Sequence, residues 1–198
     1  MMVYPEGAFY APPRRLVFSR REVRELSLAT LILLLVGFSW FGFHFHPYIV
    51  GAVLIGVLPA FLLHELAHKF SAQRQGLWAE FRIDPIGLTI TAISILAPFK
   101  VVAPGAVVVW TPYPDSSLMG RISAYGPLTN IALAILFLAF NPLLPHYLAE
   151  FAIRFNAFIA FFNLLPFGIF DGRKIIAWSW KLWGVLIVLA VILMVLPF

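Results

Sequence analysis

The sequence predicts an all-α multi-pass membrane protein with about five transmembrane helices and a small membrane-associated β element between the second and the third. Hydrophobic residues make up 62% of the 198 positions and charged residues only 12%, whereas an average soluble domain has about 45–50% and about 25%. Long apolar runs alternate with short polar connections, and the basic residues gather in alternate connections. A chain of this length cannot bury so much apolar surface in a soluble core, which excludes a soluble globular protein.

Five apolar runs have about the length that a helix needs to cross the hydrocarbon core. The predicted spans cover residues 26–43, 47–70, 122–140, 146–166 and 182–198. Basic residues precede the first span, lie between the second and third and follow the fourth, but the connections 42–46 and 141–145 hold none. The positive-inside rule therefore places the N-terminus, with the basic segment 1–25, in the cytoplasm and the C-terminus outside.

The net charge and the absence of cysteine limit which partners and cofactors the protein can have. The net charge of +5 is explained by membrane orientation. No basic stripe with interleaved aromatic residues is present, so the sequence predicts the lipid bilayer and no nucleic acid as a partner. The chain has no cysteine, which excludes disulfides, thiol catalysis and thiolate metal sites. Any metal must therefore be held by His, Asp or Glu.

Residues 86–111 do not fit the pattern of a spanning helix. Pro98, Pro104 and Gly105 interrupt the stretch, residues 89–95 alternate with period two, and residues 107–109 are β-branched. This pattern predicts two short strands on either side of the interruption. Because an open sheet edge cannot face lipid, the β element is expected to pack on protein or to lie at the cytoplasmic interface.

The second predicted span carries the pentad His64-Glu65-Leu66-Ala67-His68. Positions i and i+4 share one face of a helix, so His64 and His68 can bind the same metal ion, and Glu65 beside them can carry a proton to and from water. A charged residue within a span costs about 2.5–3.5 kcal/mol on insertion scales, which indicates a functional site. The alternative is a group of interfacial polar residues at a helix end.

A catalytic zinc usually has three protein ligands and an open fourth position, so a third ligand is needed. Glu150 lies near the outer end of the fourth span, where Arg154 can neutralise it. Asp171 follows the fourth span, which ends on the same side as the second, and it is expected at the depth of His64 and His68. The other acidic candidates lie in predicted cytoplasmic segments: Glu6, Glu22, Glu25, Glu80, Asp84 and Asp115.

Two further motifs accompany the pentad. Residues 163–172 read N-x-x-P-x-x-x-x-D-G, and residues 126–130, Gly-Pro-Leu-Thr-Asn, open the third span. Together with the pentad, these motifs resemble the site-2 protease family of intramembrane zinc metalloproteases over residues 47–175.

The resemblance implies a ligand set and a reaction. By this resemblance His64, His68 and Asp171 bind Zn²⁺, and Glu65 activates the water. It also implies that Asn163 and Asn130 form hydrogen bonds near the substrate or the reacting carbonyl; for both, the alternative is a hydrogen bond between helices.

Members of that family cut a transmembrane segment of a membrane-anchored protein near its cytosolic side and often release a regulator in this way. The strand-like stretch matches the family's membrane-associated β element, whose edge could pair with an unwound substrate. Two features depart from the pattern. Arg173 stands where many members have a second glycine, and about 50 residues between the second and third spans are too few for the PDZ domain of many bacterial members.

Other functions use the same residues. A membrane zinc carrier or sensor could have the same ligands, and a non-catalytic scaffold could retain the pentad. A prenyl-protein type of membrane zinc protease would take its third ligand from a glutamate on a later helix instead of Asp171.

Overall fold

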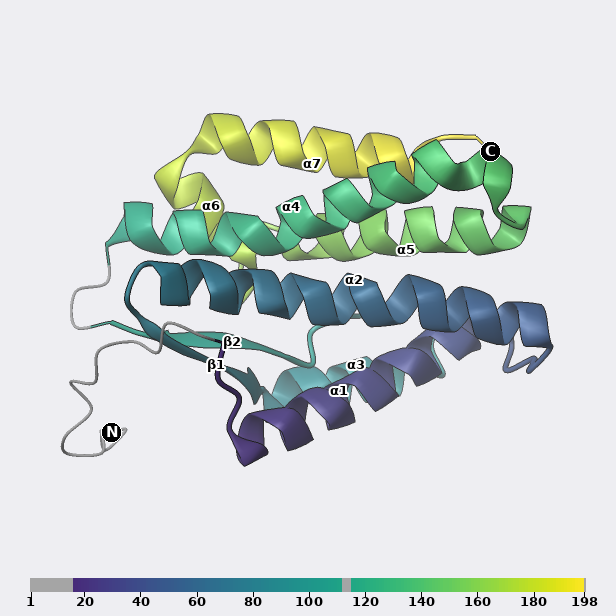
Figure 1. Cartoon of the computed structure of the whole chain (residues 1–198), viewed down its shortest axis with the longest axis horizontal. Coiled ribbons are helices and arrows are strands. Elements are labelled where there is room, and N and C mark those ends of the chain that lie inside the picture. The colour runs from purple at the N-terminus through teal and green to yellow at the C-terminus, as the bar shows by residue number, and fades with distance from the viewer. Residues whose placement is uncertain (1–15, 112–114, 198) are drawn as a thin grey trace.

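The computed structural model describes residues 16–111 and 115–197; Glu6 and most of the predicted segment 1–25 lie outside them. The elements in chain order are α1 (Arg20–Ser39), α2 (Pro47–Arg74), β1 (Trp78–Ile83), α3 (Pro85–Ser94), β2 (Gly105–Trp110), α4 (Ser116–Phe140), the 3-10 turn η1 (Asn141–Leu143), α5 (His146–Asn163), α6 (Asp171–Trp178) and α7 (Trp180–Val195). The long helices run lengthwise, and the end of α2, the start of α4 and α6 gather at one end of the bundle (Figure 1).

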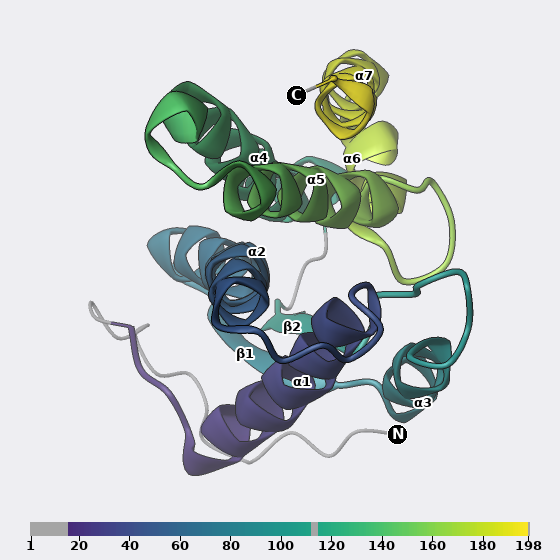
Figure 2. The same cartoon turned by 90° about the vertical axis from the view of Figure 1, so that its right-hand side faces the viewer.

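Seen along the bundle, the helices form two groups. α1, α2, α3 and the sheet lie on one side, and α4 to α7 lie on the other (Figure 2). Small residues let neighbouring helices approach closely: a Cβ on Gly37 of α1 would lie 2.8 Å from the Val57 side chain of α2, and one on Gly56 of α2 would lie 2.8 Å from the ring of Phe151 on α5. Close packing of this kind is typical of helices that associate in lipid. It places α2 in contact with both groups.

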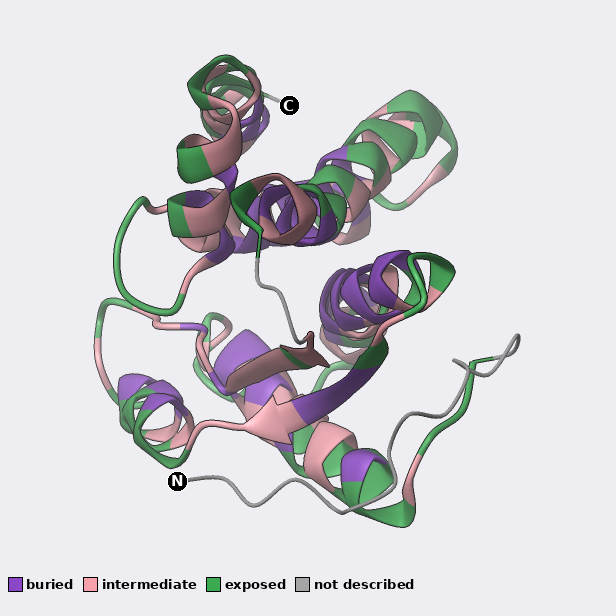
Figure 3. Ribbon diagram, turned by 90° about the vertical axis from the view of Figure 1, so that its left-hand side faces the viewer, coloured by how far each residue is buried: buried purple, intermediate pink, exposed green. Residues whose placement is uncertain are grey.

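Two of the described helical segments, Pro47–Arg74 and Ser116–Leu143, are long and apolar enough to cross a membrane by length and composition. α7 is shorter, with 16 residues, and α5 carries the ion pair between Glu150 and Arg154. The outward faces of the helices are largely exposed (Figure 3), and many of the exposed side chains are large and apolar. These features support membrane association, while five spans with a cytoplasmic N-terminus stay a prediction.

The β element differs from its prediction. Residues 89–95, predicted as a strand, belong mostly to helix α3, and the strand that pairs with β2 is β1. The two strands are antiparallel, with Trp78 opposite Trp110, Phe81 opposite Val107 and Ile83 opposite Gly105. β1 was missed although its polar residues alternate with apolar ones, which is a period-two signal.

Local capping explains why α3 is a helix. The Asp84 carboxylate accepts hydrogen bonds from the backbone N–H groups of Ile86 and Gly87, both at 3.3 Å, and Pro85 occupies the first helical position. An N-cap aspartate followed by proline is a strong helix start. Gly87 is also required sterically, because a Cβ there would lie 2.0 Å from the carbonyl oxygen of Ala103.

The faces of α3 are inverted relative to those of a helix in water. Ile86, Ile90 and Ile93 are 72%, 47% and 65% exposed, whereas Thr91 and Ser94 are buried. The hydroxyl groups of Thr91 and Ser94 donate to carbonyl oxygens of their own helix, at 2.8 and 2.7 Å. The isoleucines recur at helical spacing, and within so short a window this spacing resembles strand alternation. An outward apolar face with internally satisfied hydroxyls suits surroundings of lipid.

Nitroxide labels on single cysteines test the helical assignment of this segment, since the chain has no other cysteine. Labels at positions 86, 90 and 93 should be mobile and accessible to oxygen, and labels at positions 91 and 94 should be immobile, because α3 buries only one face. Electron paramagnetic resonance measures both properties. Equal mobility at positions 91 and 93 would instead indicate the strand, in which these residues share a face.

Candidate metal centre

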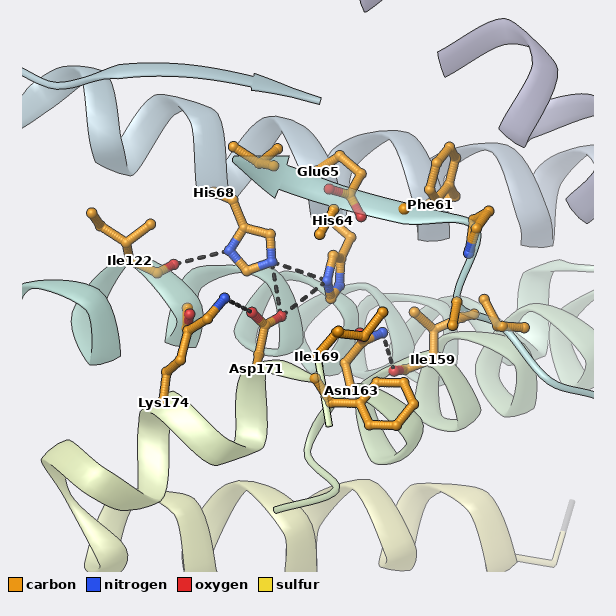
Figure 4. Close-up of a pocket in the computed structure, with 18 of the residues that line it drawn as sticks. Phe61, His64, Glu65, His68, Ile122, Ile159, Asn163, Ile169, Asp171 and Lys174 are labelled. Atoms are coloured by element: carbon orange, nitrogen blue, oxygen red, sulfur yellow. Dashed lines mark hydrogen bonds and ion pairs between the residues drawn. The ribbon is translucent and has the colours of Figure 1, made fainter. Parts of the chain in front are cut away.

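Three side chains from two helices meet at the crowded end of the bundle (Figure 4). His64 and His68 lie one turn apart on α2, and Asp171 is the first residue of α6. The Nε2 atoms of the histidines are 3.0 Å apart, and the Asp171 Oδ2 atom lies 3.0 Å from Nε2 of His68 and 3.4 Å from Nε2 of His64. All three residues are buried.

Hydrogen bonds on the far side of each ring set the histidine tautomers. Nδ1 of His64 lies 2.5 Å from Oδ1 of Asn130, and Nδ1 of His68 lies 2.9 Å from the backbone oxygen of Ile122. The orientation of the Asn130 amide follows from its Nδ2 atom, which donates to the Ala60 carbonyl at 2.7 Å. Because both partners are acceptors, this network assigns the proton to Nδ1 in each neutral ring and a lone pair to Nε2.

Two lone pairs and a carboxylate oxygen therefore face one another in a buried space. Such a set of acceptors is repulsive unless a cation lies among them. Two imidazoles and one carboxylate are ligands that suit Zn²⁺, and their outer-side hydrogen bonds are typical of metal-binding histidines. Asp171 can supply the carboxylate oxygen of this ligand set.

Close packing between α5 and α6 brings Asp171 to the histidines. A Cβ on Gly172 would lie 2.1 Å from the carbonyl oxygen of Leu164, so the first turn of α6 can approach the end of α5 only with glycine there. The same carbonyl accepts a hydrogen bond of 2.7 Å from Nε1 of Trp183 on α7. The Asp-Gly pair of the sequence motif therefore combines a ligand with the close contact that places it.

Glu65 lies next to the cluster but is not part of it. Its side chain is buried beside β2 (Figure 4), and Glu65 and Val107 of β2 line the same cavity. The Oε2 atom of Glu65 has no hydrogen-bond partner among the described residues. A buried carboxylate oxygen without a partner is costly unless water or a substrate reaches it. Glu65 can therefore hold a proton beside the metal position.

A cavity of about 40 Å³ borders the cluster, with room for roughly three waters. It is lined by α2, β2 and the segment before it, α4, α5 and α6. Asn163 lies on its wall and donates through Nδ2 to the Ile159 carbonyl at 3.0 Å. Asn130 is fully buried behind His64. The two predicted asparagines thus have different surroundings: Asn130 orients a histidine, and Asn163 faces the cavity.

Sequence reasoning missed one residue of this network. Asn156 on α5 accepts a hydrogen bond from Nδ2 of Asn130 at 3.2 Å and donates to the Ala152 carbonyl at 2.8 Å. The signal was an amide within an apolar helix, which commonly marks a hydrogen bond between helices.

Gly126 was recognised only as part of a motif. A Cβ at this position would lie 2.3 Å from Nε2 of His68 and 2.6 Å from Nε2 of His64, so α4 can cross the two rings only with glycine there.

The other carboxylates considered as third ligands have different partners. The described residues contain no second group of His, Asp and Glu with the spacing of metal ligands. Glu22 and Glu25 accept from the backbone of β1, Glu80 pairs with Arg82, Glu150 pairs with Arg154, and Asp84 and Asp115 cap helices. Glu6 lies outside the described residues.

The geometry defines a buried metal centre of the kind that metallohydrolases use. No family model and no solved structure matches the chain. The chain is 35% identical over 174 residues to "Putative zinc metalloprotease MJ0611" of Methanocaldococcus jannaschii, and the alignment covers 85% of this chain and 90% of that protein. The chain therefore belongs to the same family as this metalloprotease homologue.

Replacing Gly126 by alanine should abolish stoichiometric zinc binding, because the new Cβ would occupy the space between the two Nε2 atoms. Elemental analysis of the purified protein measures bound zinc. Gly51→Ala is the matched control, since a Cβ at Gly51 meets nothing within 4 Å. Equal zinc in both variants would contradict the assigned position of the metal.

Asn130→Ala should weaken zinc binding about 10- to 100-fold, because His64 loses the acceptor that fixes its tautomer. Competition with a chelator of known affinity measures the change. Asn163→Ala should leave zinc affinity unchanged, because the Asn163 amide donates to the Ile159 carbonyl and to none of the three ligands. An equal loss in both variants would refute the separate roles.

Proposed function

We propose that this protein is an intramembrane zinc endopeptidase that hydrolyses a peptide bond in or near the transmembrane segment of a membrane-anchored substrate, as the site-2 protease resemblance implies. The observation that carries the proposal is the convergence of His64, His68 and Asp171, with the unpartnered Glu65 oxygen beside them. The name of the related protein supports zinc and proteolysis. The long apolar helices support a membrane setting.

The residues of the site divide the chemistry. His64, His68 and Asp171 would hold Zn²⁺, which when bound supplies a Lewis acid for the scissile carbonyl and for water. Glu65 accepts a proton from the attacking water at its free carboxylate oxygen and returns that proton to the leaving amine nitrogen. Asn130 and the Ile122 carbonyl keep the histidine rings in the tautomer that presents Nε2.

The second edge of the sheet fits an extended substrate. The Asp84 N–H donates to the Pro104 carbonyl at 3.1 Å, so alternation directs the backbone groups of Gly105, Val107 and Val109 away from β1. These three residues also line the cavity beside the metal position. A helical substrate has its amides satisfied internally, so it must unwind first and can then pair with this edge as an added strand.

The proposed orientation places the site on the cytoplasmic side of the bilayer. The metal position lies where α2 ends and α4 begins, and this end of the bundle is bordered by the basic connection between them. Water would reach the cavity from that side.

A zinc carrier or sensor, the alternative function, would use the same three ligands but would not require a proton acceptor at Glu65. The buried position of Glu65, one residue from a ligand and beside a strand edge, favours hydrolysis.

Glu65→Gln should keep one zinc per chain and lower the cleavage rate by about 10²–10⁴-fold, because the amide cannot take up a proton. Cleavage of a panel of single-span fusion proteins in liposomes, read by mass spectrometry, measures the rate. Asp171→Ala should lose both zinc and cleavage. Undiminished cleavage by Glu65→Gln would rule out the mechanism, and zinc binding without any cleavage by the wild-type chain would favour the carrier.

A further inference from the structure

The outer edge of β1 is covered by carboxylates of α1 instead of a third strand. Oε1 of Glu22 accepts from the Phe81 N–H at 3.0 Å, and Oε2 of Glu25 accepts from the Ile83 N–H at 2.8 Å. Alternation makes these the N–H groups that point away from β2. Because two of its outward donors are occupied, this edge is disfavoured for pairing with another chain. Among the described residues, no carboxylate covers the β2 edge beside the metal position in this way.

Glu22 also forms a buried ion pair with α2. Its Oε2 atom lies 2.5 Å from Nζ of Lys69, and both residues are only 1% exposed. The ring of Phe18 covers the ammonium group at 4.3 Å. Buried charges are stable only when each is paired and hydrogen-bonded, and this carboxylate meets that condition with one oxygen on Lys69 and the other on the β1 backbone.

These contacts connect the predicted proton carrier to the sheet. Lys69 lies one helical turn after Glu65 on α2. Glu22 joins Lys69 to Phe81, Phe81 stands opposite Val107 in the sheet, and Val107 lines the same cavity as Glu65. Glu65 is therefore linked to the free edge of β2 through one helical turn, one ion pair, one hydrogen bond and one pair of strand residues.

We propose that Glu22 is a positioning residue that acts through Phe81 and Val107 to set the spacing between Glu65 and the free edge of β2. The Phe81 ring strengthens the link, because it packs edge-on against Phe61 of α2, with centroids 5.6 Å apart, and Phe61 lines the cavity. Without the Glu22 acceptor, the Phe81 N–H is left unsatisfied and the sheet can shift relative to α2. A peptide on the β2 edge would then lie at the wrong distance from Glu65.

The test separates the strand hydrogen bond from the ion pair. Removing one charge alone would leave the other buried and unpaired, so the double variant Glu22→Ala/Lys69→Met removes both. The partner variant Glu22→Gln/Lys69→Met is equally uncharged but keeps an amide oxygen for the Phe81 N–H. The two proteins have the same charge, and only the glutamine variant keeps the acceptor and the volume of the side chain at position 22.

The alanine double variant should bind one zinc per chain and keep its KM, while kcat falls about 10- to 100-fold through misplacement of the reacting groups. The glutamine double variant should restore kcat to within a few-fold of wild type. Equal kcat in the two proteins would overturn the positioning role. If the alanine double variant does not fold, Glu22→Asp keeps the charge pair but draws the acceptor away from Phe81, and it should show the same loss of kcat with unchanged zinc.

A distance measurement tests the positioning independently of proteolysis, since the kinetic readout rests on the proposed function. Nitroxide labels at Arg74 of α2 and Val108 of β2, in the chain without other cysteines, report the spacing of helix and sheet by pulsed electron resonance. The distribution should shift or broaden in the alanine double variant and match wild type in the glutamine double variant. An unchanged distribution in both refutes the proposal, and absence of cleavage by wild type refutes only the proposed function.

Discussion

The candidate metal site depends on holding three electron-pair donors face to face in a buried space. Two neutral imidazole nitrogens and a carboxylate oxygen repel one another unless a cation lies among them, so the surrounding helices must supply the force that keeps them together. Behind the rings, the Nδ1–H groups of His64 and His68 donate to the Asn130 amide oxygen and the Ile122 carbonyl, and these bonds orient the histidines. Glycines at positions 126 and 172 let α4 and α6 approach closely enough to close the site.

The sheet adds a second constraint, because β2 lines the cavity beside the metal position. A two-stranded sheet has two open edges, and open edges are unstable in lipid. One edge is covered by the carboxylates of Glu22 and Glu25, while the other faces the cavity beside Glu65. Burying the Glu22–Lys69 pair is costly in an apolar protein. The pair lies between α1, α2 and β1. It therefore holds these three elements together, which offsets the free-energy cost of burying the two charges.

The sequence motifs predicted most residues of the site but little of the sheet. His64 and His68 could be paired from their spacing alone, and Asp171 could be added from the shared side of two spans, because both arguments depend on helix geometry that is local and regular. The prediction of a strand at residues 89–95 was wrong. Asp84 and Pro85 start a helix before this stretch, and the exposed isoleucines recur at helical spacing. β1 had an alternating pattern of its own, but strand pairing joins residues 22 to 32 positions apart and has no local signature.

The sequence by itself determined the apolar class of the protein and the ligand types, and it predicted Glu65 as the proton carrier. The apolar composition, the absence of cysteine and the pentad each exclude alternatives through elementary chemistry, wherever the chain folds. Only the tertiary structure decided which amides support the ligands, which edge of the sheet stays open and which contacts join Glu22 to α2 and β1. These features depend on contacts between α1, α2, α4, α5 and the sheet. The spacing of these elements is set by side-chain packing between distant segments and not by any local pattern.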